Sequence, residues 1–121
     1  MSEQGFYSGK DPKVFLKHIL ESIEWIEKDI HNLTEDQFME NVPIQDAVVR
    51  RFEIIGEAIK NLSEEYKEKY PDIEWHKAMA MRNILTHGYF GVDFKIVWDT
   101  ANKTLPEFKK QIESLLEPIG T

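Results

Sequence analysis

Four chemically capable side chains stand within residues 82–89: the guanidinium of Arg82, the amide of Asn83, the imidazole of His87 and the phenol of Tyr89. Cleavage of RNA without a metal ion needs a base for the 2′-hydroxyl proton, an acid for the leaving oxygen, and a cation beside the phosphorane. Imidazole suits both proton-transfer steps, because its ordinary pKa of about 6.5 keeps both protonation states populated near neutrality. Arginine suits the third role, since its planar fork grips phosphate oxygens and stays charged. This chemistry requires no metal and no cofactor, so neither is expected.

A single imidazole cannot easily serve as base and acid in one reaction. A symmetric pair of chains that brings two such segments together would supply a second His87 and a second Arg82. We therefore expect a homodimer with the cleft on its two-fold axis.

Each of these side chains also has an ordinary structural explanation. A histidine near a helix C-terminus commonly interacts with the helix dipole. Arg82 could pair with one of the 22 acidic residues, as surface arginines usually do. Tyr89 could be a packed aromatic residue with its hydroxyl in water. At the level of single residues, both explanations stay open.

Charged residues earlier in the chain could support the segment. Arg50 and Arg51 could line a path for RNA, although adjacent charges on a helix point in different directions and a solvated face is an equal alternative. Glu53 and Glu57 are four residues apart and share a helix face, so they could fix Arg82 or pair only with nearby cations. We take Arg51 and Glu53 as candidate supporting or RNA-contacting residues.

The composition fits one globular domain over residues 1–121, with 41% hydrophobic and 12% aromatic residues for its core. The chain has no cysteine, which excludes disulfides, thiolate nucleophiles and cysteine-type zinc sites. Its net charge of −7 has the wrong sign for extended contact with phosphates, so any contact with nucleic acid must be local. Residues 1–10 are polar, predict a flexible N-terminus and contain no apolar run for a signal or a membrane span. We expect a soluble cytoplasmic protein without membrane contact.

The elements that must position the candidate site are helices. Apolar residues recur every three or four positions and no stretch alternates with a period of two, which predicts an all-α fold. Asp11 and Pro12 open a first helix that ends at His31. Thr34 opens a short second helix through a capping box, and a third runs from residue 44 to residue 62 after a break at 41–43. Within it, Gly56 suggests a close neighbouring backbone, although a tolerated surface glycine is equally compatible.

The segment that holds Arg82 is predicted to lie on a helix that starts near Trp75 and ends at Gly88, the usual residue for a left-handed C-cap. On such a helix Asn83 and His87 share a face. Arg82 lies about 140° round the axis and reaches His87 only through its long side chain.

Two further helices complete the predicted architecture. Asp93 caps one, and Pro106 opens the last. With a short turn from residue 63 to residue 70, the chain predicts an antiparallel bundle of about five helices. Trp25, Trp75 and Trp98 are expected in the core.

Residues 82–89 fit the pattern R-x4-H-x-Y. Together with the run RFEIIGEA at 51–58, Trp75 and the run GYFGVD at 88–93, this pattern resembles the HepT family of toxins within the HEPN superfamily. The resemblance covers the chain from about residue 12 to residue 116. It implies a HEPN-like helical domain that acts as a metal-independent endoribonuclease, with catalysis by Arg82 and His87 and with Asn83 at the polar position after the arginine.

The resemblance also implies a partner. HepT-like toxins are paired with MntA-like nucleotidyltransferase antitoxins in toxin–antitoxin systems of a type II-like kind, and the antitoxin attaches AMP to the motif tyrosine, here Tyr89. The physical chemistry agrees, because a bulky anionic adenylate beside the cleft would occupy the arginine and repel an RNA phosphate.

A second hypothesis is a helical binding module that mainly engages the nucleotidyltransferase, with weak or lost nuclease activity. The acidic net charge favours this alternative somewhat.

Overall fold

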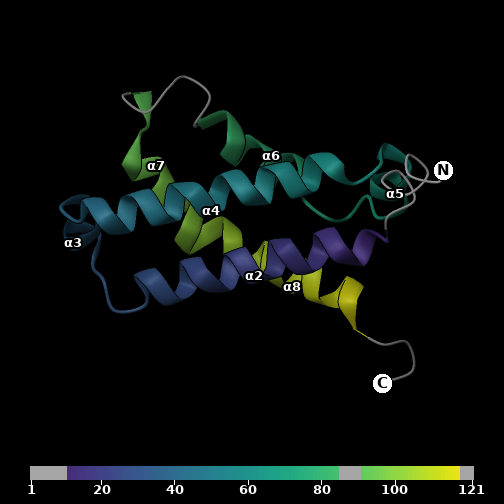
Figure 1. Ribbon diagram of the computed structural model, residues 1–121, viewed down its shortest axis with the longest axis horizontal. Helices are drawn as coiled ribbons and strands as arrows, with labels where there is room; N and C mark the ends of the chain where they lie inside the picture. Colours follow the sequence, from purple (N-terminus) through teal and green to yellow (C-terminus); the bar gives the residue numbers. More distant parts are fainter. Residues whose placement is uncertain (1–10, 85–90, 118–121) are drawn as a thin grey trace.

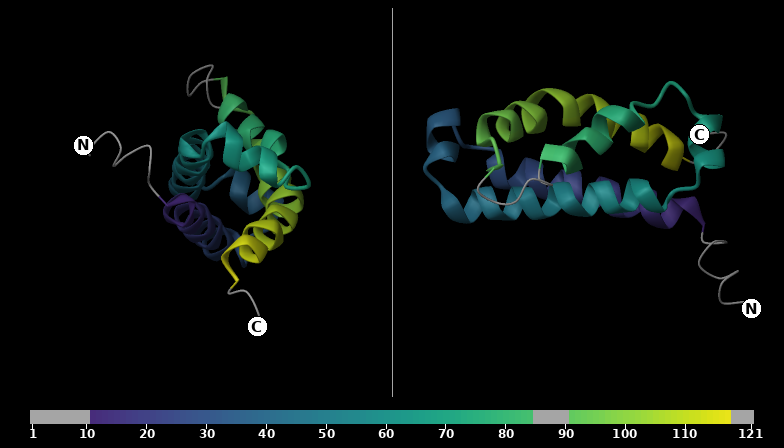
Figure 2. Two further views of the ribbon diagram at one scale, coloured as in Figure 1. Left: turned by 90° about the vertical axis from the view of Figure 1, so that its right-hand side faces the viewer. Right: turned by 90° about the horizontal axis from the view of Figure 1, so that it is seen from above.

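The longer helices of the chain run up and down around a common core. The computed structural model describes residues 11–84 and 91–117, and these residues contain no strand, so the all-α prediction is confirmed. The helices that frame the core are α2 (Pro12–Ile30), α4 (Val42–Asn61), α6 (Trp75–Ile84) and α8 (Leu105–Leu116). Helices α2 and α4 lie antiparallel and side by side (Figure 1). Helix α6 packs on α4, and α8 packs on α2, so the end view in Figure 2 shows them surrounding the core.

Helix α2 begins and ends where its sequence predicts. The Asp11 carboxylate accepts a hydrogen bond from the backbone N–H of Lys13 at 2.9 Å, and Pro12 occupies the first helical position. The predicted apolar stripe is buried, with its central members fully shielded: Leu16, Ile19, Ile23 and Ile26.

Helix α3 (Glu35–Met39) has the predicted capping box. The Thr34 hydroxyl accepts from the backbone N–H of Gln37 at 3.1 Å, and the Gln37 side chain accepts from the backbone N–H of Thr34 at 2.9 Å. Gln45 of α4 is buried, and its amide nitrogen donates to the carbonyls of Phe38 and Met39, each at 3.0 Å. The end of α3 is therefore fastened to the beginning of α4.

The predicted break at 41–43 is shorter than expected, because α4 already begins at Val42. The Asn41 side chain accepts from the backbone N–H of Ile44 at 3.0 Å, which makes Asn41 the N-cap. Pro43 fits in the first turn, where its missing N–H would have no helical partner. Gly56 is buried in α4, so it is not a tolerated surface glycine.

Pro106 lies in the first turn of the last helix, α8 (Leu105–Leu116), as predicted, but no break in the helical backbone precedes it. Helix α7 (Phe94–Asp99) continues through a π-helical stretch, η2 (Thr100–Thr104), directly into α8. The backbone stays right-handed helical at Thr104 and Leu105, and the N–H of Leu105 donates to the carbonyl of Thr100, five residues back. Pro106 is accommodated because the regular ladder of α-helical hydrogen bonds is already interrupted in front of it.

Helix α5 (Glu64–Lys69) is the predicted turn, opened by the Ser63 hydroxyl, which accepts from the backbone N–H of Tyr66. The Oγ of Ser22 in α2 is buried and has no hydrogen-bond partner in the described part of the chain.

None of the helices in residues 11–84 and 91–117 combines the length and the apolar composition that crossing a bilayer requires.

Two lysines connect helices at the surface. Lys109 of α8 donates to the Glu27 carboxylate of α2 at 2.8 Å, and this hydrogen bond raises the pKa of the lysine. Lys95 of α7 lies between the carboxylates of Glu35 and Asp99, which raise its pKa in the same way.

Candidate active site

Helix α6 presents the first half of the predicted catalytic segment. Its first turn is firmly held: the indole N–H of Trp75 donates to the carbonyl of Tyr70 at 3.2 Å, and the ring meets Phe108 of α8 edge-on at 6.2 Å. The backbone N–H of Glu74 donates to the side chain of Gln111 at 3.0 Å. Ala78, one turn further, is fully buried. The first turn of α6 is therefore held against α8 and against the segment that precedes it.

Arg82 and Asn83 belong to the last turn of α6. That end lies beside the middle of α4 in Figure 1 and in the right-hand view of Figure 2. His87 and Tyr89 lie outside the described residues, as does the predicted C-cap at Gly88. The predicted meeting of Arg82 with His87 therefore stays a prediction, and so does the role of Asn83.

The two supporting candidates on α4 have identified neighbours. The guanidinium carbon of Arg51 lies 5.5 Å from the centre of the Trp25 ring, which is cation–π range. Glu53 forms an ion pair with Arg50 at 3.7 Å, one of the two pairings that its sequence allows. Both members of this pair are exposed, so it contributes little to stability.

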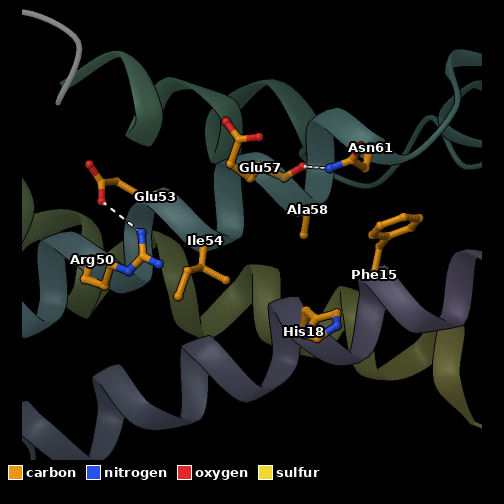
Figure 3. A pocket seen from close by; sticks show the side chains of 8 residues that line it. All are labelled: Phe15, His18, Arg50, Glu53, Ile54, Glu57, Ala58 and Asn61. Carbon is orange, nitrogen blue, oxygen red and sulfur yellow. Dashed lines mark hydrogen bonds and ion pairs between the residues drawn. The ribbon is translucent and has the colours of Figure 1, made fainter. Parts of the chain in front are cut away.

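A hollow of about 300 Å³ opens between α2 and α4 (Figure 3). In the figure, Ile54 and Ala58 point from α4 toward α2, while Glu53 and Glu57 leave α4 on the side of α6. Phe15 and His18 of α2, with Ile54, Ala58, Glu53, Glu57, Arg50 and Asn61 of α4, line the hollow. The groove is apolar along its floor and charged along its rim.

Trp25 corrects a prediction made from the sequence. Trp75 is buried and Trp98 half-buried, but Trp25 is 42% exposed. The signal was available in the spacing: Trp25 falls between Ile23 and Ile26, both on the buried stripe, and therefore points elsewhere. Lys28 lies 4.9 Å from the ring centre, so the exposed indole is flanked by two cations.

A second hollow of about 590 Å³ lies at the other end of α6. It is lined by the apolar side chains of Pro71, Ile73, Trp75 and Met79 and by the polar side chains of Glu64, Lys67, Glu68 and His76. None of the predicted site residues that the structure describes lines this hollow. Within the described residues, no group of three histidine or acidic side chains could hold a metal ion.

Comparison with known proteins assigns the chain to a family. The model of the family described as "Ribonuclease HepT-like" matches residues 19–115. A Thermococcus cleftensis protein named "Probable ribonuclease HepT" is 39% identical over 103 residues, which cover 85% of this chain and 94% of the relative. A Caldanaerobacter subterraneus protein named "Putative RNase" is 38% identical over 108 residues, or 89% of this chain and 96% of that one.

A third relative is longer than this chain. The Methanocaldococcus jannaschii protein named "Gamma-glutamylcyclotransferase and putative RNase" is 49% identical over 110 residues, which are 91% of this chain but only 50% of the relative. This chain thus corresponds to about half of that protein. No solved structure matches the chain. The family model covers most of the chain, and the chain therefore belongs to the HepT-like ribonuclease family.

Proposed function

We propose that the chain is a metal-independent endoribonuclease toxin whose catalytic groups are Arg82 and His87. The observation that carries the proposal is the R-x4-H-x-Y pattern of residues 82–89, which starts in the last turn of α6, in a chain that belongs to a ribonuclease family. Helix α6, whose last turn holds Arg82, packs against α4. A catalytic constellation benefits from such support because small displacements of catalytic groups are costly.

The reaction is a transesterification followed by release of two products. One His87 imidazole takes the proton of the ribose 2′-hydroxyl as the 2′-oxygen forms a bond to phosphorus. The bond from phosphorus to the 5′-oxygen breaks, and a protonated imidazole gives its proton to that leaving oxygen. Arg82 stabilises the charge on the non-bridging oxygens. The products are a 2′,3′-cyclic phosphate and a 5′-hydroxyl.

Two imidazoles are needed in opposite protonation states, so the proposed enzyme is a homodimer with one cleft on its two-fold axis. Asn83, Arg51 and Glu53 are proposed to assist RNA binding or to position the catalytic pair. The negative net charge of −7 limits the contact with RNA to this cleft, so we expect a short recognised segment.

The proposed regulator is an MntA-like nucleotidyltransferase antitoxin acting on Tyr89. In this step the phenolic oxygen forms a bond to the α-phosphorus of ATP, the bond to the β-phosphate breaks, pyrophosphate leaves, and the phenolic proton passes to solvent. The attached phosphate places a negative charge next to Arg82 and so opposes entry of an RNA phosphate.

The test is cleavage of a labelled RNA in the presence of a chelator. We expect cleavage with cyclic-phosphate ends by the wild-type protein, and loss of about 10²-fold or more of the rate in His87→Ala. His76→Ala is the matched control, because His76 is an exposed histidine of α6 outside the motif and should leave the rate unchanged. A folded His87→Ala protein that cleaves at the wild-type rate would remove His87 from the mechanism.

The acidic composition favours a second candidate, a binding module whose main task is to hold the nucleotidyltransferase. This candidate predicts stable co-purification with that partner and no cleavage at any protein concentration. The intact mass of the chain after co-expression with the nucleotidyltransferase separates the two candidates. A mass gain of one adenylate supports the regulated toxin if Tyr89→Phe abolishes the gain and the control Tyr70→Phe retains it.

A further inference from the structure

Trp25 of α2 exposes an aromatic ring that the proposed reaction does not use. The side chain is 42% exposed, and with Glu21, Glu24 and Lys28 it lines a hollow of about 250 Å³. This volume is below the range of about 300–1,000 Å³ that holds a drug-sized molecule, so it suits a flat group of the size of one nucleobase. An exposed indole beside such a hollow is a platform on which an unpaired base can stack.

Two cations lie over this ring without a carboxylate partner. The guanidinium carbon of Arg51 is 5.5 Å from the ring centre, and the Nζ of Lys28 is 4.9 Å from it. Within residues 11–84 and 91–117 neither cation forms an ion pair, although Glu24 precedes Lys28 by four residues, the spacing of a helical ion pair. Both cations are therefore available to neutralise the phosphates on either side of a stacked base.

The carboxylate of Glu21 can choose among the bases. Glu21 stands four residues before Trp25, so the two side chains are neighbours on one face of α2. In the described part of the chain Glu21 forms no hydrogen bond or ion pair, whereas Glu24 interacts electrostatically with Lys109 of α8. The two oxygens of a carboxylate can accept from two adjacent donors. Among the four RNA bases, guanine presents such a pair on its Watson–Crick edge, the N1–H and the N2 amino group.

This platform lies within reach of the proposed cleft. Arg51 belongs to the middle of α4, and the end of α6 that holds Arg82 lies beside the same stretch (Figure 1). Packed helices have axes about 8–10 Å apart, so α2 and α6, which both pack on α4, are separated by no more than about 20 Å. A short single strand spans this distance, since successive nucleotides of one strand advance about 3.4 Å even when stacked.

We propose that Trp25, Glu21 and Arg51 form a subsite for one unpaired guanine of the RNA substrate. The inference rests on the proposed function, because it takes RNA to be the molecule that enters the cleft. The base stacks on the indole, and its N1–H and N2 amino group donate to the Glu21 carboxylate. Arg51 and Lys28 accompany the adjoining phosphates. The enzyme is then expected to cut RNA at a short, fixed distance from an unpaired guanosine.

Binding of short RNAs to an inactive protein tests the subsite without cleavage. The probes are labelled uridine oligonucleotides with one central guanosine, inosine or adenosine, titrated with His87→Ala protein and followed by fluorescence anisotropy. Inosine keeps the N1–H but lacks the N2 amino group, so we expect it to bind about tenfold more weakly than guanosine. Adenosine has no N1–H and should bind more weakly still. Equal affinity for guanosine and inosine, or no binding of either, overturns the inference.

Matched variants in the same background identify the side chains. Trp25→Ala should weaken binding of the guanosine probe by about tenfold, and Ile96→Ala, at an exposed apolar position of α7, should leave it unchanged. Glu21→Gln replaces one acceptor by a donor, so it should reduce the preference for guanosine over inosine to less than about threefold. Glu65→Gln, at an exposed position of α5, should retain the preference. A folded Trp25→Ala protein that binds the guanosine probe like its parent overturns the subsite.

Tryptophan emission reports the stacking itself. Trp25 is exposed, whereas Trp75 is buried and Trp98 half-buried, so a base that stacks on an accessible indole acts on Trp25. We expect the guanosine probe to quench the emission and Trp25→Phe to remove the quenching while it retains part of the affinity. Quenching that persists in Trp25→Phe contradicts stacking on this ring.

Cleavage assays separate this inference from the proposed function. A protein that cuts RNA with a chelator present but treats guanosine and inosine alike contradicts the subsite and leaves the ribonuclease intact. A protein that never cuts RNA but keeps the guanosine preference supports the subsite and contradicts the nuclease. If Trp25→Ala changes the sedimentation of the protein and not its affinity for RNA, Trp25 belongs to a protein interface and the subsite is wrong.

Discussion

At the scale of residues, the proposed catalysis depends on the shape of one cation. A guanidinium can donate to two non-bridging oxygens at once, whereas an ammonium of the same charge acts as a point. Negative charge develops on both non-bridging oxygens of the phosphorane, so a guanidinium stabilises this transition state better than an ammonium does.

We therefore expect Arg82→Lys to lower kcat/KM for RNA cleavage by about 10²-fold while the KM changes little. The measurement is steady-state cleavage of a short labelled RNA with chelator present. An unchanged thermal melt shows that the substitution leaves the fold intact. A rate within a few-fold of the wild type would mean that Arg82 contributes charge alone.

Single residues also show where sequence reasoning succeeds and where it stops. The Thr34 capping box could be predicted because both partners lie within one turn. The stacking of Arg51 on Trp25 joins residues that are 26 positions apart and lie on two helices, so no local sequence pattern predicts it. The proposed catalytic pair, Arg82 and His87, follows from residue type and spacing together with a family resemblance, and the described residues do not test it.

At the scale of elements, the connection between α3 and α4 depends on a buried amide. Gln45 supplies donors to two carbonyls at the end of α3, the helix whose Phe38 packs against Phe94 and Trp98. Removing the amide leaves those carbonyls without this donor in a partly buried place.

Gln45→Ala is therefore expected to lower the free energy of unfolding by about 2 kcal/mol. Urea denaturation at pH 7 measures the change. Glu40→Ala, which alters an exposed residue of the same connection, should change the stability by less than about 0.5 kcal/mol. Equal effects of the two substitutions would contradict the role given to the Gln45 amide.

The Lys109–Glu27 pair between α8 and α2 predicts a dependence on pH. The pKa of Lys109 is raised in the folded chain, so its contribution is fully present below 10.5, the ordinary lysine value, and is lost as the pH rises through the folded pKa. Because the pair is partly exposed, Lys109→Gln should cost only about 0.5 kcal/mol at pH 7.

The difference between Lys109→Gln and the wild type should close as the pH is raised beyond 10.5. Unfolding curves at neutral and strongly alkaline pH measure it. Lys110→Gln, at the exposed neighbouring position, is expected to show no such closing difference.

The helix boundaries show which elements a sequence reveals. Caps and apolar stripes placed α2 and α3 well, because those signals are local. Pro106 correctly marks the first turn of α8, but the sequence does not reveal that α7 continues into α8, because a π-helical turn has no composition of its own.

At the scale of the whole molecule, the proposed enzyme is a pair of chains that share one cleft. If both imidazoles of a pair are needed, a mixed dimer with one His87 is inactive. The activity of a mixture then depends on the fraction of chains that meet an intact partner.

An equal mixture of wild-type and His87→Ala chains, exchanged to equilibrium, should keep about a quarter of the activity of the same total amount of wild-type chain, because random pairing leaves about one dimer in four intact. Co-purified mixtures assayed on RNA with a chelator provide the measurement. A mixture with His76→Ala should keep full activity. Retention of about half would mean that each chain acts alone.

The π-helical stretch between α7 and α8 has an evolutionary consequence. A π turn is an α-helix with one residue added. Here the buried residues Val97, Ala101 and Leu105 are each four positions apart and stay on the same side of the continuous helix across the π turn. Deleting one exposed residue there, such as Lys103, would shorten the second spacing to three, which is normal for one side of an α-helix, so the buried sides of α7 and α8 would stay aligned. The same loss inside α4 would turn everything beyond it by about 100°. Natural variation in chain length should therefore collect at residues 100–104, where a deletion of Lys103 is expected to fold and a deletion of Glu53 is not.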